Sequence, residues 1–424
     1  MEEIKFALDT FYAVMAGALV MWMAAGFTML EAGLVQKKNV AEIVTKNLGL
    51  YSIACIMYLV CGFVLMYPAG SAFGLDGILP AIGTSVGLST SMDPAEIGLL
   101  YGSEGSIEGG DFVGYYSQQA DFFFQVVFVA TAMSIVSGAV AGRMKIMPFF
   151  LFAVVLTGFI YPIQGYWNWG GGFLSEGGYS DYAGSGTVHL CGAAAALAVV
   201  LALGPRNGKY SNGQVNAIPG SNIPLAALGV WILWMGWFGF NGGSELKVSE
   251  VDSAVAVSQV FLNTNLAAAG GVVGAIVISY VLGGNKIDVT MAINGAIAGL
   301  VAITAGPSAP SAGAATLIGL VGGVIVYFSI LLLDRKLKID DPVGAISAHG
   351  IVGIFGVLVV PLTADVEFGA QLKGVLAIGG FTFITSFIAI KVINIFLPIR
   401  ATDEEQEIGL DVAEIGVEAY PEFK

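Results

Sequence analysis

Long apolar blocks dominate this chain, and they are solid rather than alternating. A membrane-spanning helix needs about 20 mostly apolar residues, and we count eleven such blocks, one of which is a shorter run after Met147 extended by its apolar flanks. Clear examples are residues 6–29, 48–66, 151–163, 188–203, 223–240, 255–282, 314–333 and 375–397. The strands of a membrane β-barrel would alternate instead. The pattern therefore predicts an all-α polytopic membrane protein with eleven transmembrane helices.

The composition agrees with this prediction. Of the 424 residues, 56% are hydrophobic and only 11% are charged, whereas soluble domains carry about 25% charged residues. The opening MEEIK lacks the basic segment of a secretory signal, so residues 6–29 are expected to remain as the first helix. The net charge of −14 gives no indication of nucleic-acid binding, and the expected surroundings are a lipid bilayer.

The distribution of charge predicts the orientation, because lysine and arginine concentrate on the cytoplasmic side of membrane proteins. Residues 47–142 contain neither type, yet they include acidic side chains such as Asp76 and Asp111. We therefore expect this acidic segment outside the cytoplasm. All but three of the 17 basic residues then fall on the cytoplasmic side, the exceptions being Lys5, Lys247 and Lys373. The N-terminus is predicted outside and the C-terminus in the cytoplasm.

The only two histidines occur in two copies of one pattern. Residues 181–189 read DYAGSGTVH and residues 341–349 read DPVGAISAH, so both fit D-x-x-G-x-x-x-x-H. In the predicted orientation, Asp181 precedes its helix at the outer face and Asp341 does so at the inner face. Eight helical residues span about 12 Å, so His189 and His349 are expected to meet near the centre of the membrane.

Motifs that enter from opposite faces predict two five-helix halves inverted relative to each other. This is a plan that transporters use, with the binding site near the midplane. The predicted repeats cover about residues 6–204 and 223–362, and a final helix follows at about 373–398. Residues 1–400 then form the membrane domain, and residues 401–424 form a cytoplasmic tail.

Each motif residue also has an ordinary structural role. An aspartate before a helix accepts hydrogen bonds from its first N–H groups, and Pro342 would then be the first helical residue. We expect this capping for both aspartates, although Asp181 could also shape the outer mouth. For the histidines the alternatives are a hydrogen-bonded core imidazole or a haem ligand. Two histidines at repeat-related depth instead favour a role along a pathway through the membrane.

These motifs resemble the ammonium transporter, methylammonium permease and Rhesus family, in its plant-type and bacterial branch. The matching segments, in the family's order, are GLVQKKN at 33–39, Phe124-Gln125, WGGG at 169–172, the first histidine motif, GWFGFNGGS at 236–244 and DDPVGAISAHG at 340–350. The likeness covers nearly the whole chain. It implies a homotrimer in the cell membrane that transports ammonium or ammonia, and methylammonium, through one hydrophobic pore per subunit, with no enzymatic activity and no cofactor.

The resemblance also implies roles for individual residues. Trp169 and Ser244 would recruit the cation at the outer face, because an indole ring attracts a cation. Two stacked phenylalanines would close the pore below them, above the twin histidines, while Asp181 would be mainly structural and Trp237 would lie near the outer mouth. The implied substrate-binding residues are Trp169, Ser244, Trp237, Asp181, Phe128, Phe240, His189 and His349.

Several points stay open at this stage. Glu31 lies at the end of the first helix, where many members have a tyrosine. Because a carboxyl at membrane depth is costly, Glu31 is expected either near the cytoplasmic interface or with a partner, and its role is either structural pairing or a role in the pore. The tail keeps the family's GLD at 409–411 and is expected to regulate transport, with a PII-type signal protein as a candidate partner. The alternative functions are an ammonium sensor that acts through a separate partner, since the chain stops 24 residues after Arg400, and a Rhesus-like facilitator of small neutral gases, which Trp169 and Ser244 disfavour.

Overall fold

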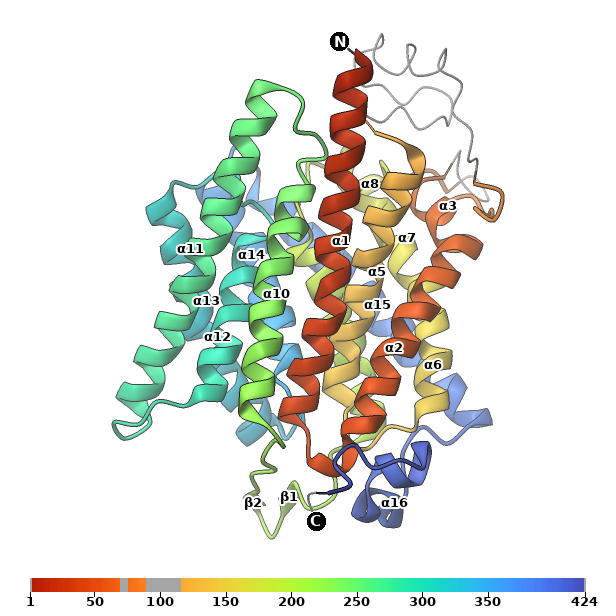
Figure 1. Cartoon of the computed structure of the whole chain (residues 1–424), viewed down its shortest axis with the longest axis vertical. Coiled ribbons are helices and arrows are strands. Elements are labelled where there is room, and N and C mark those ends of the chain that lie inside the picture. The colour runs from red at the N-terminus through yellow and green to blue at the C-terminus, as the bar shows by residue number, and fades with distance from the viewer. Residues whose placement is uncertain (1, 69–74, 89–115, 423–424) are drawn as a thin grey trace.

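The computed structural model describes residues 2–68, 75–88 and 116–422, and within them the protein is a helical bundle with one short hairpin (Figure 1). The α-helices are α1 (Glu2–Leu34), α2 (Val40–Met57), α3 (Phe63–Met66), α5 (Gln118–Val140), α6 (Ile146–Val155), α7 (Tyr161–Asn168), α8 (Phe173–Glu176), α9 (Cys191–Leu203), α10 (Ile223–Gly243), α11 (Val251–Leu282), α12 (Val289–Ile303), α13 (Ala312–Leu331), α14 (Val352–Val359), α15 (Phe368–Phe396) and α16 (Asp403–Ile408). The hairpin pairs β1 (Tyr210–Ser211) with β2 (Gln214–Val215) in antiparallel register.

Short helical turns of other types join or extend these helices. Two are 3₁₀ turns, η1 (Lys37–Asn39) and η7 (Val360–Leu362). The others are π-helical turns: η2 (Tyr58–Gly62), η3 (Leu156–Ile160), η4 (Ser185–Leu190), η5 (Leu332–Leu337), η6 (Ile346–Ile351) and η8 (Asp411–Ile415). Through η2 and η3, α2 continues into α3 and α6 continues into α7. Such π turns are frequent at functional sites.

Nine helical segments among the described residues are long and apolar enough to cross a membrane. Two shorter apolar helices, Val289–Ile303 and Ile346–Leu362, accompany them. The expected all-helical class with many apolar spans is therefore confirmed. The count of eleven crossings and the orientation of the chain stay predictions, and the part of the acidic segment at 89–115 lies outside the described residues.

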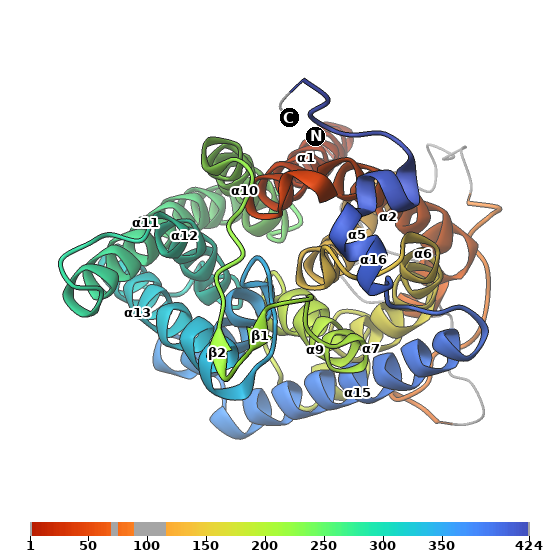
Figure 2. The same cartoon turned by 90° about the horizontal axis from the view of Figure 1, so that it is seen from below.

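The helices form two groups when the bundle is viewed along its length. Figure 2 shows α10, α11, α12 and α13 on one side and α2, α5, α6, α7 and α9 on the other, while α15 lies along the edge of both groups. The two termini lie at opposite ends of the bundle, and the hairpin and α16 share the end that carries the C-terminus (Figure 1). An odd number of membrane crossings would place the two termini at opposite ends in this way.

Glycines bring α1 and α10 into close contact. A Cβ atom on Gly33 would lie 2.4 Å from the backbone nitrogen of Ala226, and one on Gly229 would lie 2.3 Å from that of Leu30. Small residues let membrane helices approach at this distance. The contact fixes the last turns of α1, which carry Glu31.

The two histidine segments run in opposite directions. After α9 ends at Leu203, the chain brings Arg206 to Asp340, which directly precedes the second motif. The backbone and side chain of Arg206 donate hydrogen bonds of 2.8 to 2.9 Å to the Asp340 carboxylate. The end of the first histidine helix thus lies beside the start of the second, as the predicted inversion requires. The inversion of the complete five-helix halves stays a prediction.

Candidate functional site

His189 and His349 form the centre of the candidate site. Their Nδ1 atoms lie 3.2 Å apart, within hydrogen-bond distance, and the residues are 0% and 3% exposed. A hydrogen bond between two Nδ1 atoms needs one donor and one acceptor. In a neutral pair, one ring therefore carries its proton on Nδ1 and the other carries its proton on Nε2. Among the described residues, nothing hydrogen-bonds to Nε2 of His189. This nitrogen is available to exchange a proton with a small molecule.

The same local structure positions both histidines. The carboxylate of Asp181 accepts a hydrogen bond from the backbone N–H of Gly184 at 3.2 Å and from that of Gly186 at 2.9 Å. Asp341 accepts from the amides three and five residues further on, at 3.1 and 2.7 Å. Both motifs then enter π-helical turns, η4 and η6, which contain the histidines. The prediction that each aspartate accepts hydrogen bonds from the first N–H groups is confirmed, but the residues directly before η4 and η6 are Gly184 and Ala345.

A left-handed glycine in each motif delays the start of the helix. Gly184 has φ +106° and Gly344 has φ +80°, a region that residues with a Cβ atom rarely adopt. A Cβ atom on Gly184 would also lie 2.5 Å from Cγ2 of Val188. Because of this turn, Pro342 lies ahead of η6, which begins at Ile346. The prediction that Pro342 is the first helical residue was wrong.

A file of aromatic rings leads from the surface to the histidines. Phe240 stacks on His189 at 5.3 Å between ring centroids, and Phe128 lies 4.1 Å from Phe240. The half-buried indole of Trp169 meets Phe128 edge-on at 6.1 Å. The two phenylalanines are fully buried and in contact, so a molecule that follows this route must displace their rings.

Trp237 lies deeper than the sequence suggested. Its indole is fully buried and stacks on His189 at 4.9 Å, and its Nε1 donates a 2.8 Å hydrogen bond to Oγ1 of Thr304. Residues three apart share a helix face, so Trp237 and Phe240 on α10 reach the same imidazole. The structure therefore places Trp237 beside the histidine pair instead of at an outer mouth.

Trp169 and Ser244 reach the ring file from different helical segments. Nε1 of Trp169 donates to the backbone oxygen of Asp181 at 3.1 Å, and Oγ of Ser244 donates to that of Phe240 at 2.8 Å. Both side chains are half-buried. With its proton already donated, the Ser244 hydroxyl keeps lone pairs that can accept hydrogen bonds from a cation with N–H groups.

Two cavities lie beyond His349. The smaller offers about 10 Å³ to the centre of a water-sized molecule, and Phe27, Glu31, Asn294 and His349 are among its walls. The larger offers about 350 Å³ and shares Asn294 and Val343 with the smaller one. The histidine pair therefore has contacting rings on one side and cavities on the other.

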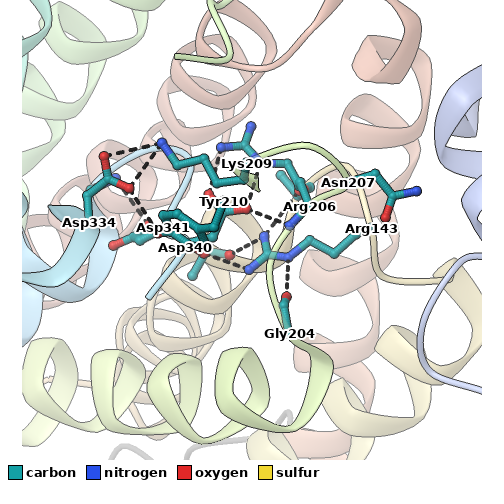
Figure 3. Close-up of polar contacts among 12 residues, drawn as sticks. Arg143, Gly204, Arg206, Asn207, Lys209, Tyr210, Asp334, Asp340 and Asp341 are labelled. Atoms are coloured by element: carbon teal, nitrogen blue, oxygen red, sulfur yellow. Dashed lines mark hydrogen bonds and ion pairs between the residues drawn. The ribbon is translucent and has the colours of Figure 1, made fainter. Parts of the chain in front are cut away.

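An ionic cluster fixes the segment before the second histidine motif (Figure 3). Nε and Nη2 of Arg206 donate to the Asp340 carboxylate, and Nη2 of Arg143 donates to its backbone oxygen at 2.6 Å. Burial alone would raise the pKa of Asp340, but the hydrogen bonds from Arg206 and the charges of both arginines outweigh it and lower the pKa to about 2. The aspartate therefore stays ionised, which holds the start of the motif in place.

Sequence reasoning missed three residues that the structure adds to this site. Phe27 lies 6.2 Å from the His349 ring, Asn294 lines both cavities, and Thr304 holds the indole of Trp237. Asn294 and Thr304 are polar residues within and just after the apolar helix α12. Polar side chains at membrane depth often mark functional positions, and this signal could have identified both.

The chain is similar to a known family, to individual relatives and to solved structures over most of its length. The sequence profile described as Ammonium Transporter Family matches residues 11–420. Ammonium transporter Amt2 of Archaeoglobus fulgidus is 37% identical over 454 residues, which cover 100% of this chain and 90% of that protein. The solved structure titled "Sensor Amt Protein" superposes with a TM-score of 0.87 at 33% identity, covering 98% of this chain and 100% of its own. The crystal structure of Candida albicans Mep2 gives a TM-score of 0.81 at 26% identity, with coverage of 99% and 92%.

Proposed function

The chain belongs to the Ammonium Transporter Family and is a multi-pass membrane protein, and from this premise we propose that it carries ammonium across the cell membrane along the ring file. Trp169 and Ser244 recruit the cation, Phe128 and Phe240 form the gate, and the histidine pair takes up the proton. Methylammonium, a cation of the same type, follows the same route. The observation that carries this proposal is the 3.2 Å contact between the two buried imidazoles.

Desolvation explains why histidines belong at this position. A bare ammonium ion that passes two contacting aromatic rings loses its water shell, and burying an unpaired charge in apolar surroundings is very costly. Neutral ammonia needs only hydrogen-bond partners. We therefore propose that the ion gives up one proton to Nε2 of His189, which becomes doubly protonated, and that ammonia continues past the pair.

The Nδ1 contact gives the proton a way onward. A His189 ring protonated at Nε2 can pass its Nδ1 proton across the 3.2 Å contact to Nδ1 of His349, so one proton enters the pair for each one that leaves. Two charged rings at this distance would repel each other. The pair therefore carries at most one extra proton, and imidazole suits this exchange because its ordinary pKa is near neutral.

The finer architecture belongs to the same proposal. We assign eleven transmembrane helices in two inverted five-helix repeats and a final helix, an external N-terminus and a homotrimer with one pore per subunit. Counting Val289–Ile303 and Ile346–Leu362 with the nine longer apolar helices supports the first assignment. The tail carries the regulatory contacts, and the cytoplasmic face is where a PII-type protein would bind.

A sensor is the second candidate, because one structure of similar fold is titled "Sensor Amt Protein". A sensor that acts through a separate partner needs to bind ammonium but does not need to conduct it. Conduction therefore separates the two candidates.

The test is electrical. Purified protein is reconstituted in liposomes, and the current after an ammonium jump is measured together with uptake of labelled methylammonium. A transporter gives protein-dependent, saturable uptake, and a current if the proton crosses as well. Ammonium binding without uptake above that of protein-free liposomes would favour the sensor and refute the transport proposal.

A further inference from the structure

Glu31 is a buried acidic residue near the apolar C-terminal end of a long helix. It lies in the last turns of α1 and is 1% exposed. Asn47 and Ser137 donate hydrogen bonds to its Oε2 atom, at 3.2 and 2.7 Å. Its other oxygen, Oε1, is buried and accepts no hydrogen bond from the described residues. The side chain is thus held firmly by one oxygen while the second has no bonded partner.

Lys46, the residue before Asn47 in the sequence, is paired with a different carboxylate. Nζ of Lys46 lies 3.1 Å from a carboxylate oxygen of Glu42, and both side chains are fully buried. The hydrogen bonds that Glu31 receives come from an amide and a hydroxyl, which are neutral donors. The nearest compensating charge, that of Lys46, is shared with Glu42. Because a buried carboxylate with only neutral donors bonded to it is costly, purely structural pairing is a poor explanation for Glu31.

The cavity beside Glu31 is rich in acceptors. Asn294 also lines it, and the Oδ1 atom of Asn294 is likewise buried without a hydrogen-bond donor among the described residues. The amide nitrogen of Asn294 is already committed to the backbone oxygen of Thr290 at 3.0 Å. The space, about 10 Å³ for the centre of a water-sized molecule, suits a single small molecule. Two acceptors without donors fit a small cation that has only N–H donors to offer.

We propose that Glu31, together with Asn294, forms an inner binding site for the ammonium ion after it has passed the histidines. The inference rests on the proposed function and deepens it. Ammonia that reaches this cavity takes back one proton from the histidine pair through His349, which lines the same space. The proton that left the ion on the outer side is thereby returned, and the pair is again neutral. The re-formed ion donates N–H hydrogen bonds to Oε1 of Glu31 and Oδ1 of Asn294.

The position of the cavity gives the ion an exit. Asn294 and Val343 border both this cavity and the larger one, which also includes Asp288, Asp334 and Asp341 among its walls. Arg206 and Lys209 also line the larger cavity, and Lys209 pairs with Asp334 at 3.0 Å. The larger cavity is therefore a polar space of mixed charge through which the ion can leave. The inner site is therefore the place where the ion re-forms and from which it leaves. A change at this site should alter the apparent affinity for ammonium measured from the inner side.

The substitution Glu31→Gln tests this inference with little change in shape. The amide oxygen of glutamine can still accept from Asn47 and Ser137, while its NH₂ group replaces Oε1 and removes the negative charge. Asp121→Asn is the matched control, because Asp121 is also a buried carboxylate, lies in α5 and does not border the cavity. Ammonium currents are recorded from membrane vesicles of both orientations, so that half-saturation is measured separately from each side.

We expect Glu31→Gln to raise the half-saturation concentration for ammonium from the inner side about tenfold, because one hydrogen bond to a charged group is lost. The half-saturation concentration from the outer side should change by less than about twofold. Glu31→Asp keeps the charge and should retain most of the inner affinity, and it serves as the test variant if Glu31→Gln fails to fold. A conducting Glu31→Gln protein with an unchanged inner half-saturation, or an equal rise in Asp121→Asn, would overturn the inner site alone. Wild-type vesicles without ammonium current or uptake would overturn the proposed function itself.

Discussion

The two histidines have different surroundings, so the two sides of the site are not equivalent. His189 is stacked against Trp237 and Phe240, at 4.9 and 5.3 Å, and its ring is fully buried. His349 faces Phe27 and the small cavity instead. In the proposed route, His189 meets a molecule that arrives through the aromatic rings, and His349 meets a space with oxygen acceptors. A proton passed between their Nδ1 atoms follows the same direction.

The first prediction concerns recruitment at Trp169. Replacing it with leucine keeps an apolar surface but removes the aromatic face, whose attraction for a cation is worth about 0.5–2 kcal/mol. We expect Trp169→Leu to raise the outer half-saturation concentration for labelled methylammonium about 2- to 30-fold, with a smaller change in the maximal rate. Trp231→Leu, at an exposed indole on α10, is the control. An unchanged half-saturation constant in Trp169→Leu would remove the indole from the recruitment site.

At the residue scale, the repeat alone predicted that the histidines meet, because equal spacing after each aspartate places them at equal depth. The position of an acidic residue at the end of an apolar block also identified Glu31 as a residue that needs an explanation. The sequence could not reveal the cavity that Glu31 shares with Asn294, because that cavity depends on how α1 and α12 pack. For the same reason it could not reveal that Trp237 reaches His189.

At the element scale, the helices that carry the site are interrupted ones. The motif turns η4 and η6 each follow a left-handed glycine and an aspartate cap. Apolar blocks predicted the long helices because a bilayer demands them. They could not predict π-helical turns, since one extra residue in a turn leaves the apolar content of a block unchanged. The glycine in D-x-x-G indicates a turn at this position. The prediction that Pro342 begins the helix did not take this glycine into account.

The second prediction tests this turn. Gly184→Ala forces a side chain into a left-handed conformation, at a cost of about 1–3 kcal/mol, and places its Cβ atom 2.5 Å from Val188. We expect a lower melting temperature in detergent and weaker ammonium transport per folded protein, because His189 lies in the turn that follows. Gly178→Ala is the control, with φ +77° and open space around its Cβ position. Similar losses in both variants would mean that the motif turn has no special role.

At the scale of the whole molecule, the tail closes over one end of the bundle. Asp411 accepts a 2.8 Å hydrogen bond from the backbone of Glu42, and Glu405 pairs with Lys145 at 2.7 Å. Leu410 is fully buried, and its N–H donates to Oδ1 of Asn39. The sequence indicated an acidic tail with a family motif, but contacts between residues more than 200 positions apart are not visible in it. Charge asymmetry likewise predicts which end is cytoplasmic, and only a membrane can test that.

The third prediction is that the tail regulates transport and is not needed for folding. Truncation after Arg400 removes contacts at one end of the bundle and leaves the apolar helices and the ring file complete. We expect a folded trimer with altered ammonium transport, measured by size-exclusion chromatography and by uptake in liposomes. The point variant Glu405→Gln, which weakens the pair with Lys145 and the hydrogen bond that Glu405 accepts from the backbone of Thr402, should change transport less than the truncation does. Loss of the assembly on truncation would assign the tail a structural role instead.

The central claim, that the two imidazoles relay a proton while ammonia passes, is tested most directly by replacing each histidine. Wild type, His189→Ala and His349→Ala are reconstituted in liposomes, and ammonium-driven and potassium-driven currents are compared at equal amounts of folded protein. The account predicts that either substitution abolishes or strongly slows selective ammonium transport, and that the ratio of potassium to ammonium current rises as water fills the space left by the ring. Identical ammonium rates and identical selectivity in all three proteins would contradict it and would make the histidines structural.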